Sequence, residues 1–158
     1  MGLCLLCGDY SWSCTYSNLQ EYRMIVIRAC LDWIKNVNLS KPSWMIAPYQ
    51  IDPELQADEK EQLIPFLESL MKEGRINYSV FNNNLPSSIC YFGLVGLIPF
   101  VNHSDCDGYY SPGDILNIRE LFSRIFDFIP ESSNKENLKE LIKILEYSSE
   151  QKMYIIFC

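Results

Sequence analysis

Residues 17–35, SNLQEYRMIVIRACLDWIK, predict a helix around which the rest of the chain has to pack. Ser17 is a suitable N-cap, and Gln20 follows at the capping-box position. Apolar residues recur at helical spacing along the segment, at Leu19, Tyr22, Val26, Ala29 and Trp33. Further apolar residues occupy the sides between them, and a helix that is apolar nearly all round is largely buried. We therefore expect this helix to lie in the core.

Short apolar runs on either side of this helix predict the strands of a small sheet. Residues 3–6 are uniformly apolar, which is typical of a strand buried on both faces. Residues 153–157 form a similar run, expected beside the first strand. Residues 75–81 alternate between apolar and polar side chains and residues 89–94 are apolar, so both are expected to be strands. Residues 8–16 are expected to form a turn-like segment.

Three further helices are expected downstream. One starts at Asp52, which caps a proline at the first helical position, and ends at Gly74. Pro65 lies inside this helix and is expected to kink or split it. Residues 111–129 and 134–147 have apolar residues on one helical face. The sequence therefore predicts one α+β domain over the whole chain, with about four strands packed against about four helices.

The composition favours a folded, acidic protein over several other classes. The chain of 158 residues is 48% hydrophobic, which is too apolar for a disordered protein. It has 13 Lys and Arg against 20 Asp and Glu, a formal net charge of −7. A protein that coats nucleic acid needs a basic surface, so we expect no nucleic-acid partner. No apolar run approaches the length that spans a bilayer, so we expect no membrane partner.

The cysteines indicate a reducing compartment. Seven cysteines is an odd number, and the first residues do not resemble an export signal, which together favour free thiols and a cytoplasmic protein. Cys4 and Cys7 form a C-x-x-C pair, but on a strand their side chains point to opposite faces. A zinc site would need a second such pair, which the sequence lacks.

Two short segments carry the whole excess of negative charge. Residues 52–61 contain five acids and one lysine, and residues 105–114 contain three acids and no base. The first group is Asp52, Glu54, Asp58, Glu59 and Glu61, and the second is Asp105, Asp107 and Asp114. Acids in the first turn stabilise a helix, which accounts for Asp52, Glu54 and Asp114. Asp58, Glu59 and Glu61 lie deeper in their helix, where they form either a solvated face or a docking surface for a basic partner.

The segment from His103 to Asp114, HSDCDGYYSPGD, has some features of a calcium-binding loop. With Gly108 as the loop glycine, oxygen ligands would come from Asp105, Asp107, Ser111 and Asp114. The first position would then be His103, which is a poor ligand for Ca²⁺. The alternative is a tight Asp-Gly turn followed by a helix that Ser111 caps, with Asp114 completing a capping box.

The sequence makes no positive case for an enzyme. Any Cys-His or Ser-His pair must use His103, the single histidine of the chain, and Cys106 is the cysteine nearest to it in sequence. Three residues of separation on a turn do not establish catalytic geometry, and a histidine that holds the turn is the alternative. A glycine-rich phosphate loop is also lacking, so we expect no cofactor.

Trp12 lies in a polar setting, between two serines. Tryptophan is enriched at the centres of protein interfaces, so Trp12 is a candidate partner-binding residue. The alternative is a core residue that packs over the sheet edge with its N–H bonded to a neighbour.

Two of these segments resemble a known family. Residues 8–13, GDYSWS, and residues 103–108, HSDCDG, the latter followed by Ser111 and Pro112, resemble the immunity proteins of bacterial polymorphic-toxin systems, in the family numbered seventy. Related sequences often carry an acid after Ser-Pro, where this chain has Gly113. That departure weakens the calcium interpretation.

The resemblance implies a protein that binds and neutralises a cognate toxin domain in the cytoplasm of the producing cell. Many such toxins are nucleases with basic clefts, which an acidic surface can cover and capture rapidly. On this interpretation Asp58, Glu59, Glu61, Trp12 and Asp105 are the expected partner-binding residues. The alternative function is a calcium-binding interaction module that uses residues 103–114.

Overall fold

The first two strands form a β-hairpin at the N-terminus. The computed structural model describes three stretches of the chain, residues 2–39, 52–104 and 107–158. Strand β1 (Gly2–Cys7) pairs antiparallel with strand β2 (Tyr10–Thr15), with Leu5 opposite Trp12. Gly8 makes the turn with a φ of 58°, which glycine adopts without steric cost. The expectation of a turn over residues 8–16 is therefore wrong, because most of that segment is a strand.

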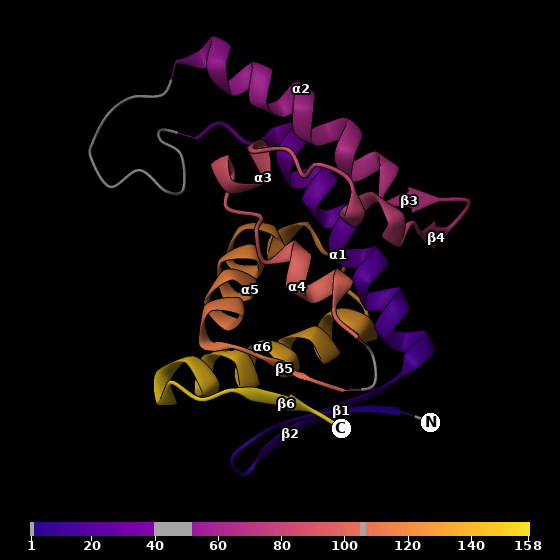
Figure 1. Ribbon diagram of the computed structural model, residues 1–158, viewed down its shortest axis with the longest axis vertical. Helices are drawn as coiled ribbons and strands as arrows, with labels where there is room; N and C mark the ends of the chain where they lie inside the picture. Colours follow the sequence, from indigo (N-terminus) through magenta and orange to yellow (C-terminus); the bar gives the residue numbers. More distant parts are fainter. Residues whose placement is uncertain (1, 40–51, 105–106) are drawn as a thin grey trace.

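The hairpin is one half of a four-stranded antiparallel sheet. Strand β6 (Ile155–Phe157) pairs with β1, which confirms the expected neighbour of the first strand, and strand β5 (Tyr109–Tyr110) pairs with β6. The order is β2-β1-β6-β5, so the two ends of the chain meet in the middle of the sheet. Figure 1 shows the sheet at one end of the molecule, with the helices stacked on one side of it.

Because the helices cover one face, the other face of the sheet is exposed. Leu3 and Leu5 of β1 are buried, whereas Leu6 is 38% exposed and Ile156 of β6 is 55% exposed. The prediction that the first strand is buried on both faces is therefore wrong. Cys4 points outward and Cys7 is buried, as the alternation of side chains along a strand requires.

Helix α1 (Tyr16–Asn36) is the central helix that the sequence predicts. Its N-cap is Thr15, whose side chain accepts a hydrogen bond from the backbone N–H of Asn18. More than half of its residues are buried, and it contacts α2 (Pro53–Ser69), α5 (Pro112–Ile125) and α4 (Leu97–Asn102). Together with α6 (Ser133–Gln151) these helices enclose one continuous apolar core.

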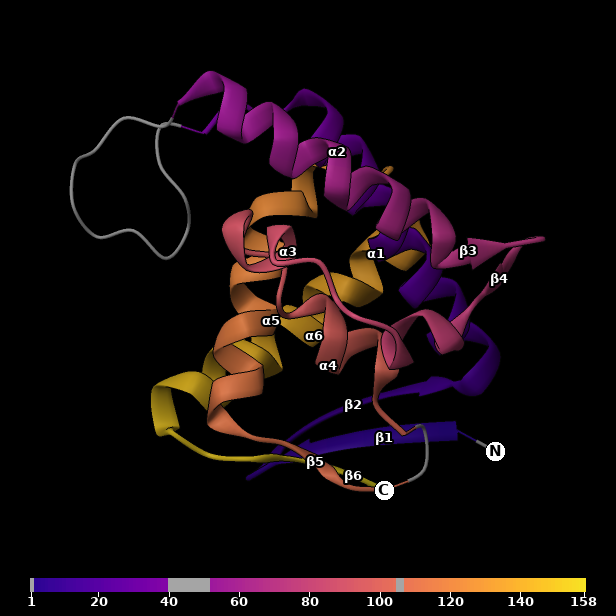
Figure 2. The same cartoon turned by 45° about the horizontal axis from the view of Figure 1, so that its top comes forward.

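The middle of the chain is more helical than its sequence suggests. After α2 come a two-residue hairpin, β3 (Met71–Lys72) and β4 (Arg75–Ile76), and the 3₁₀ helix η1 (Tyr78–Asn82). The expected strands over residues 75–81 and 89–94 are therefore wrong beyond Ile76, and α3 (Ser88–Tyr91) replaces the second. The 3₁₀ helix η2 (Phe126–Phe128) follows α5. Figures 1 and 2 label the α-helices and the strands. A short apolar run is compatible with a buried helix as well as a strand, and here the helix is found.

Pro65 lies within α2 and does not divide it. The helix runs without interruption from Pro53 to Ser69, and Pro65 is on its exposed side. The missing N–H therefore leaves the carbonyl of Glu61, four residues earlier, at the solvent side of the helix. Figure 2 shows α2 as the outermost helix, at the end of the molecule opposite the sheet.

Candidate functional site

The exposed side of α2 carries a row of carboxylates. Glu54, Asp58, Glu61 and Glu68 follow one another at intervals of four, three and seven residues, so they share one face of the helix. All four are exposed, and we call them the acidic stripe. The helix begins at Pro53 because Asp52 caps it, accepting the backbone N–H of Glu54 at 2.9 Å. The positive end of the helix dipole stabilises the acids of the first turn. The stripe extends the negative charge beyond that turn.

The opposite side of α2 is bound to the end of α1. The side-chain amide of Gln56 accepts the backbone N–H of Leu39 at 2.9 Å and donates to the Leu39 carbonyl at 3.3 Å. The Lys60 ammonium donates to the carbonyl of Val37, the C-cap of α1. A cation at a helix C-terminus is favourable because it meets the negative end of the helix dipole. The lysine of α2 is therefore turned toward α1 and away from the stripe.

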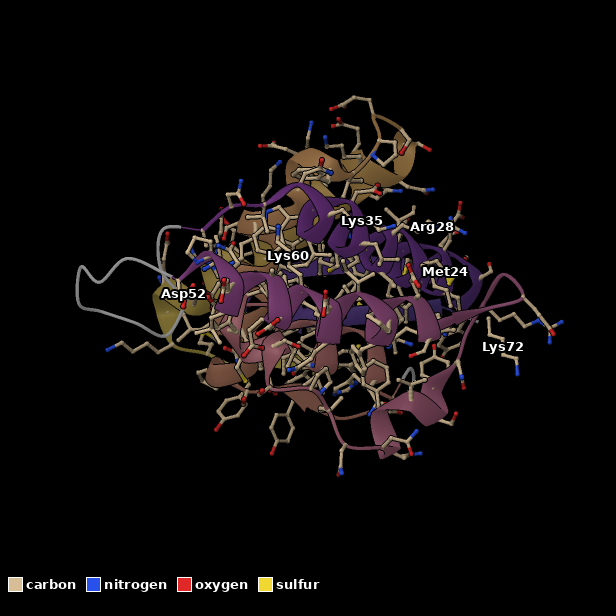
Figure 3. The ribbon with its side chains drawn as sticks, turned by 90° about the horizontal axis from the view of Figure 1, so that it is seen from above. Met24, Arg28, Lys35, Asp52, Lys60 and Lys72 are labelled. Carbon is tan, nitrogen blue, oxygen red and sulfur yellow. The ribbon has the colours of Figure 1, made fainter. Side chains whose placement is uncertain are left out.

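Figure 3 shows α1 and α2 from above. Lys60 lies on the side of α2 that faces α1, and Arg28 and Lys35 lie on α1 beyond it. A cleft of about 520 Å³ between α1 and the β3–β4 hairpin is lined in part by Arg28 and Arg75, together with Met24 and Glu21. Arg28 and Lys35 therefore lie on the α1 side of the helix pair, whereas the outer face of α2 is acidic.

The acidic stripe is not neutralised by neighbouring bases. Within the part of the chain that the structure describes, the ion pairs lie on or next to α5 and α6, and none includes an acid of α2. Four pairs are present there: Glu120 with Arg124, Glu131 with Lys135, Glu136 with Lys139, and Glu140 with Lys143. Glu136 and Glu140 of α6 are therefore charge-paired, in contrast to the four acids of the stripe.

Glu59 has a different environment from Asp58 and Glu61. Its side chain is half-buried, and its Oε2 is buried without a hydrogen-bond partner among the described residues. The hydroxyl of Tyr91, on α3, is likewise buried without a partner. Burial raises the pKa of Tyr91, and the nearby carboxylates of Glu59 and Asp52 raise it further. Of the three α2 acids expected at the interface, two are therefore on the outer surface and Glu59 faces α3.

Trp12 is a core residue, which was the alternative to a partner-binding role. It is 7% exposed, and its indole Nε1 donates to the backbone carbonyl of Asn137 at 3.1 Å. Its ring lies against that of Tyr22, with centroids 5.9 Å apart. The indole therefore joins the sheet to α6 and α1, and its surface is not available for a partner.

His103, the C-cap of α4, lies against the last two strands of the sheet. The Nδ1 of His103 lies 2.7 Å from the Ser104 carbonyl, and Nε2 lies 3.1 Å from that of Tyr109. The imidazole stacks on Phe157 of β6, with centroids 3.9 Å apart. Gly108 has a φ of 103°, and a Cβ on it would lie 3.2 Å from the imidazole. The ring therefore joins the end of α4 to β5 and β6.

The candidate calcium ligands are divided between structural roles and residues outside the description. The Ser111 hydroxyl accepts the N–H of Asp114 and the Asp114 carboxylate accepts that of Ser111, both at 3.1 Å, which is the expected capping box. Asp107 accepts a hydrogen bond from Ser104. Asp105 and Cys106 lie outside the described residues. Among those described, no three His, Cys, Asp or Glu side chains converge as a metal site would require.

A buried arginine connects the end of α4 to the central helix. Arg23 of α1 is 1% exposed, and it donates to the carbonyls of Phe100 at 3.0 Å and His103 at 2.8 Å. It also donates to the Tyr78 hydroxyl at 3.3 Å. The helical periodicity of this segment does not single out Arg23. The available signal was a lone charge within the apolar run of residues 22–27.

No protein-family model, curated protein or solved structure matches the chain. Within the described stretches, none of the helices combines the length and the apolar character needed to cross a membrane. The acidic stripe is a feature of the described residues that internal packing does not explain, and it is the candidate functional site.

Proposed function

We propose that the protein is an immunity protein that binds a cognate toxin domain in the cytoplasm of the producing cell and neutralises it without catalysis. The observation that carries this proposal is the acidic stripe, four exposed carboxylates with no ion pair among the described residues. The resemblance of residues 8–13 and 103–108 to the immunity family supports the same function. On this proposal the partner presents a basic surface to α2.

The spacing of the stripe has an energetic cost that a binding role would explain. Glu54 and Asp58 are four residues apart and Asp58 and Glu61 are three apart, so each pair repels across one helical turn. Such pairs destabilise a helix by about 0.2–0.5 kcal/mol each. Lys60, the lysine within α2, is bonded to α1 and does not relieve this repulsion. A basic partner would convert the repulsion into attraction.

Electrostatic attraction of this kind acts mainly on the rate of association. A patch of one sign raises the association rate constant by about 10- to 1,000-fold, and salt reduces the gain. Nuclease domains have basic clefts for their polyanionic substrates, so a carboxylate stripe would both attract and cover such a cleft. The proposal therefore favours a basic nuclease domain as the toxin.

Co-expression with a toxin tests the proposal. The probe is the C-terminal domain of a large secreted protein, if the gene directly upstream encodes one, produced in a heterologous bacterium with and without this chain. We expect the domain alone to stop growth and the chain to restore it. A pair that does not associate, or a chain that associates without restoring growth, would overturn the assignment as an immunity protein.

A further inference from the structure

The pairing of β1 with β6 brings two cysteines together. The backbone N–H of Cys4 donates to the carbonyl of Cys158 at 2.9 Å, and the N–H of Cys158 donates to that of Cys4 at the same distance. The register continues with Leu5 opposite Phe157. Residues that exchange both hydrogen bonds are directly opposite, and their side chains lie on the same face of the sheet.

Both thiols are on the open face of the sheet. Leu6 and Ile156, the outward neighbours two residues away on the same strands, are 38% and 55% exposed. Cys158 is exposed, Cys4 is half-buried, and both are free thiols. The Sγ of Cys158 lies 3.6 Å from the Cys4 carbonyl, which places it over the partner strand. A small reagent therefore reaches this pair without any unfolding.

The spacing of such a pair permits a disulfide but does not favour a relaxed one. Opposite Cα atoms in a hydrogen-bonded antiparallel pair are about 5.5 Å apart, within the range of about 4.4–6.8 Å that disulfides span. Their Cβ atoms are separated by up to about 5.5 Å, whereas a disulfide requires about 3.8 Å. Closing the bond therefore draws the strands together, and the resulting strain makes the disulfide easy to reduce.

We propose that Cys4 and Cys158 form a redox-modification site, a reversible disulfide that arises by exchange with a small-molecule disulfide such as oxidised glutathione. The Cys158 thiolate attacks one sulfur of oxidised glutathione, a mixed disulfide forms, and one glutathione thiolate leaves. Cys4, after losing its proton to solvent, attacks the Cys158 sulfur and displaces the second glutathione. Two protein thiols are thereby oxidised, and one oxidised glutathione is reduced to two glutathione molecules.

The order of attack follows from the environments of the two thiols. Burial raises the pKa of the Cys4 thiol, and the neighbouring Cys158 thiol raises it further. Less of Cys4 is therefore present as the reactive thiolate, and Cys158 is also the more exposed. Cys158 is accordingly the attacking residue, and Cys4 resolves the mixed disulfide. The closed bond ties the first strand to the last, which holds the centre of the sheet.

The experiment is incubation of the full chain with oxidised glutathione, followed by alkylation and intact-mass and peptide mass spectrometry. We expect wild type to lose two hydrogen atoms and to yield one cross-linked peptide pair containing Cys4 and Cys158. Reduced glutathione in excess should reverse the change. In Cys4→Ser the resolving thiol is missing, so the mixed disulfide at Cys158 should increase about ten-fold or more, because a neighbouring thiol competes as an intramolecular reactant.

Cys90→Ser is the matched control, because Cys90 is exposed on α3, which lies well away from the sheet (Figure 1). It should leave the Cys4–Cys158 cross-link unchanged. Wild type that accumulates the mixed disulfide at Cys158 to the same level as Cys4→Ser would overturn the proposal. The proposal would also be overturned if both thiols of wild type were still alkylated separately after incubation, while an unchanged far-ultraviolet circular dichroism spectrum showed that the protein was folded.

Discussion

Gly96 lies at the start of α4, where this helix meets the backbone of α5. Its φ of −60° suits any residue, so the requirement for glycine is steric. A Cβ at this position would lie 2.2 Å from the carbonyl oxygen of Asn117 and 2.6 Å from the nitrogen of Ile118. Ordinary contacts of a Cβ begin at about 3.4 Å. Gly96→Ala therefore requires the two helices to separate by about 1 Å at a backbone contact that no rotamer change can relieve.

The free energy of this separation is expected to exceed that of ordinary overpacking. Extra carbon in a close-packed core costs about 1–3 kcal/mol when side chains can adjust, and more when they cannot. The ring of Phe100 on α4 packs edge to face on Phe122 of α5, with centroids 5.5 Å apart, and the shift would disturb this contact too. We expect Gly96→Ala to lower the free energy of unfolding by about 3 kcal/mol or more.

Urea unfolding followed by circular dichroism measures this change, and Gly113→Ala provides its control. Gly113 lies in the first turn of α5, where a Cβ would come no closer than 3.7 Å to the Ser111 hydroxyl. Alanine is the better helix former by up to about 1 kcal/mol, so Gly113→Ala should be neutral or stabilising. For a chain of this size, 3 kcal/mol corresponds to a fall in Tm of about 6–12 °C. Both variants unfolding within 1 kcal/mol of wild type would refute the argument.

Three further changes probe the site. Arg23→Met leaves the buried carbonyl of Phe100 and the part-buried carbonyl of His103 without this donor, so urea unfolding should show a loss of about 3 kcal/mol or more. Ser111→Ala removes a cap and should cost about 1 kcal/mol, while Ca²⁺ should leave the wild-type Tm unchanged; a rise in Tm with Ca²⁺ would restore the calcium alternative. Glu59→Gln should lower the raised pKa of Tyr91, read as phenolate absorbance against Tyr91→Phe. Because the folded-state pKa is raised, the stability contributed by Tyr91 is present below pH ~10 and lost as pH rises through the folded pKa.

Local sequence rules were sufficient to predict the features that depend on residues close together in the chain. The cap at Asp52, the capping box of Ser111 and Asp114, and the buried central helix are all present as predicted. These features depend on contacts within about four residues, which the sequence displays directly. The partnership of the first and last strands also followed, because two short apolar strands need a common sheet to be buried.

The failures occurred where distant segments decide the outcome. Strand β2 was missed although Ser11, Trp12 and Ser13 alternate, because their polar character is also that of a turn. Whether a buried apolar run such as residues 89–94 is helical depends on the surfaces around it. Glu59 lies near Tyr91 of α3, whereas its neighbour Asp58 is exposed to solvent. This difference depends on the position of α3, which no local pattern specifies. The same holds for Lys60, whose charge is directed to the end of a helix more than twenty residues earlier.

If the acidic stripe binds the partner, the position of the negative charge, and not only the net charge of the chain, should determine the association rate. Changing Glu54, Asp58, Glu61 and Glu68 to the corresponding amides removes four charges from α2. A control variant removes four from α6 and has the same net charge, through the amides of Glu136, Glu140, Glu146 and Glu150. The decisive measurement is stopped-flow association of each variant with the basic toxin domain at low ionic strength. We expect the α2 variant to associate about ten-fold more slowly and to lose most of its salt dependence, with the α6 control close to wild type. Equal association rates for the α2 and α6 variants would contradict the central claim.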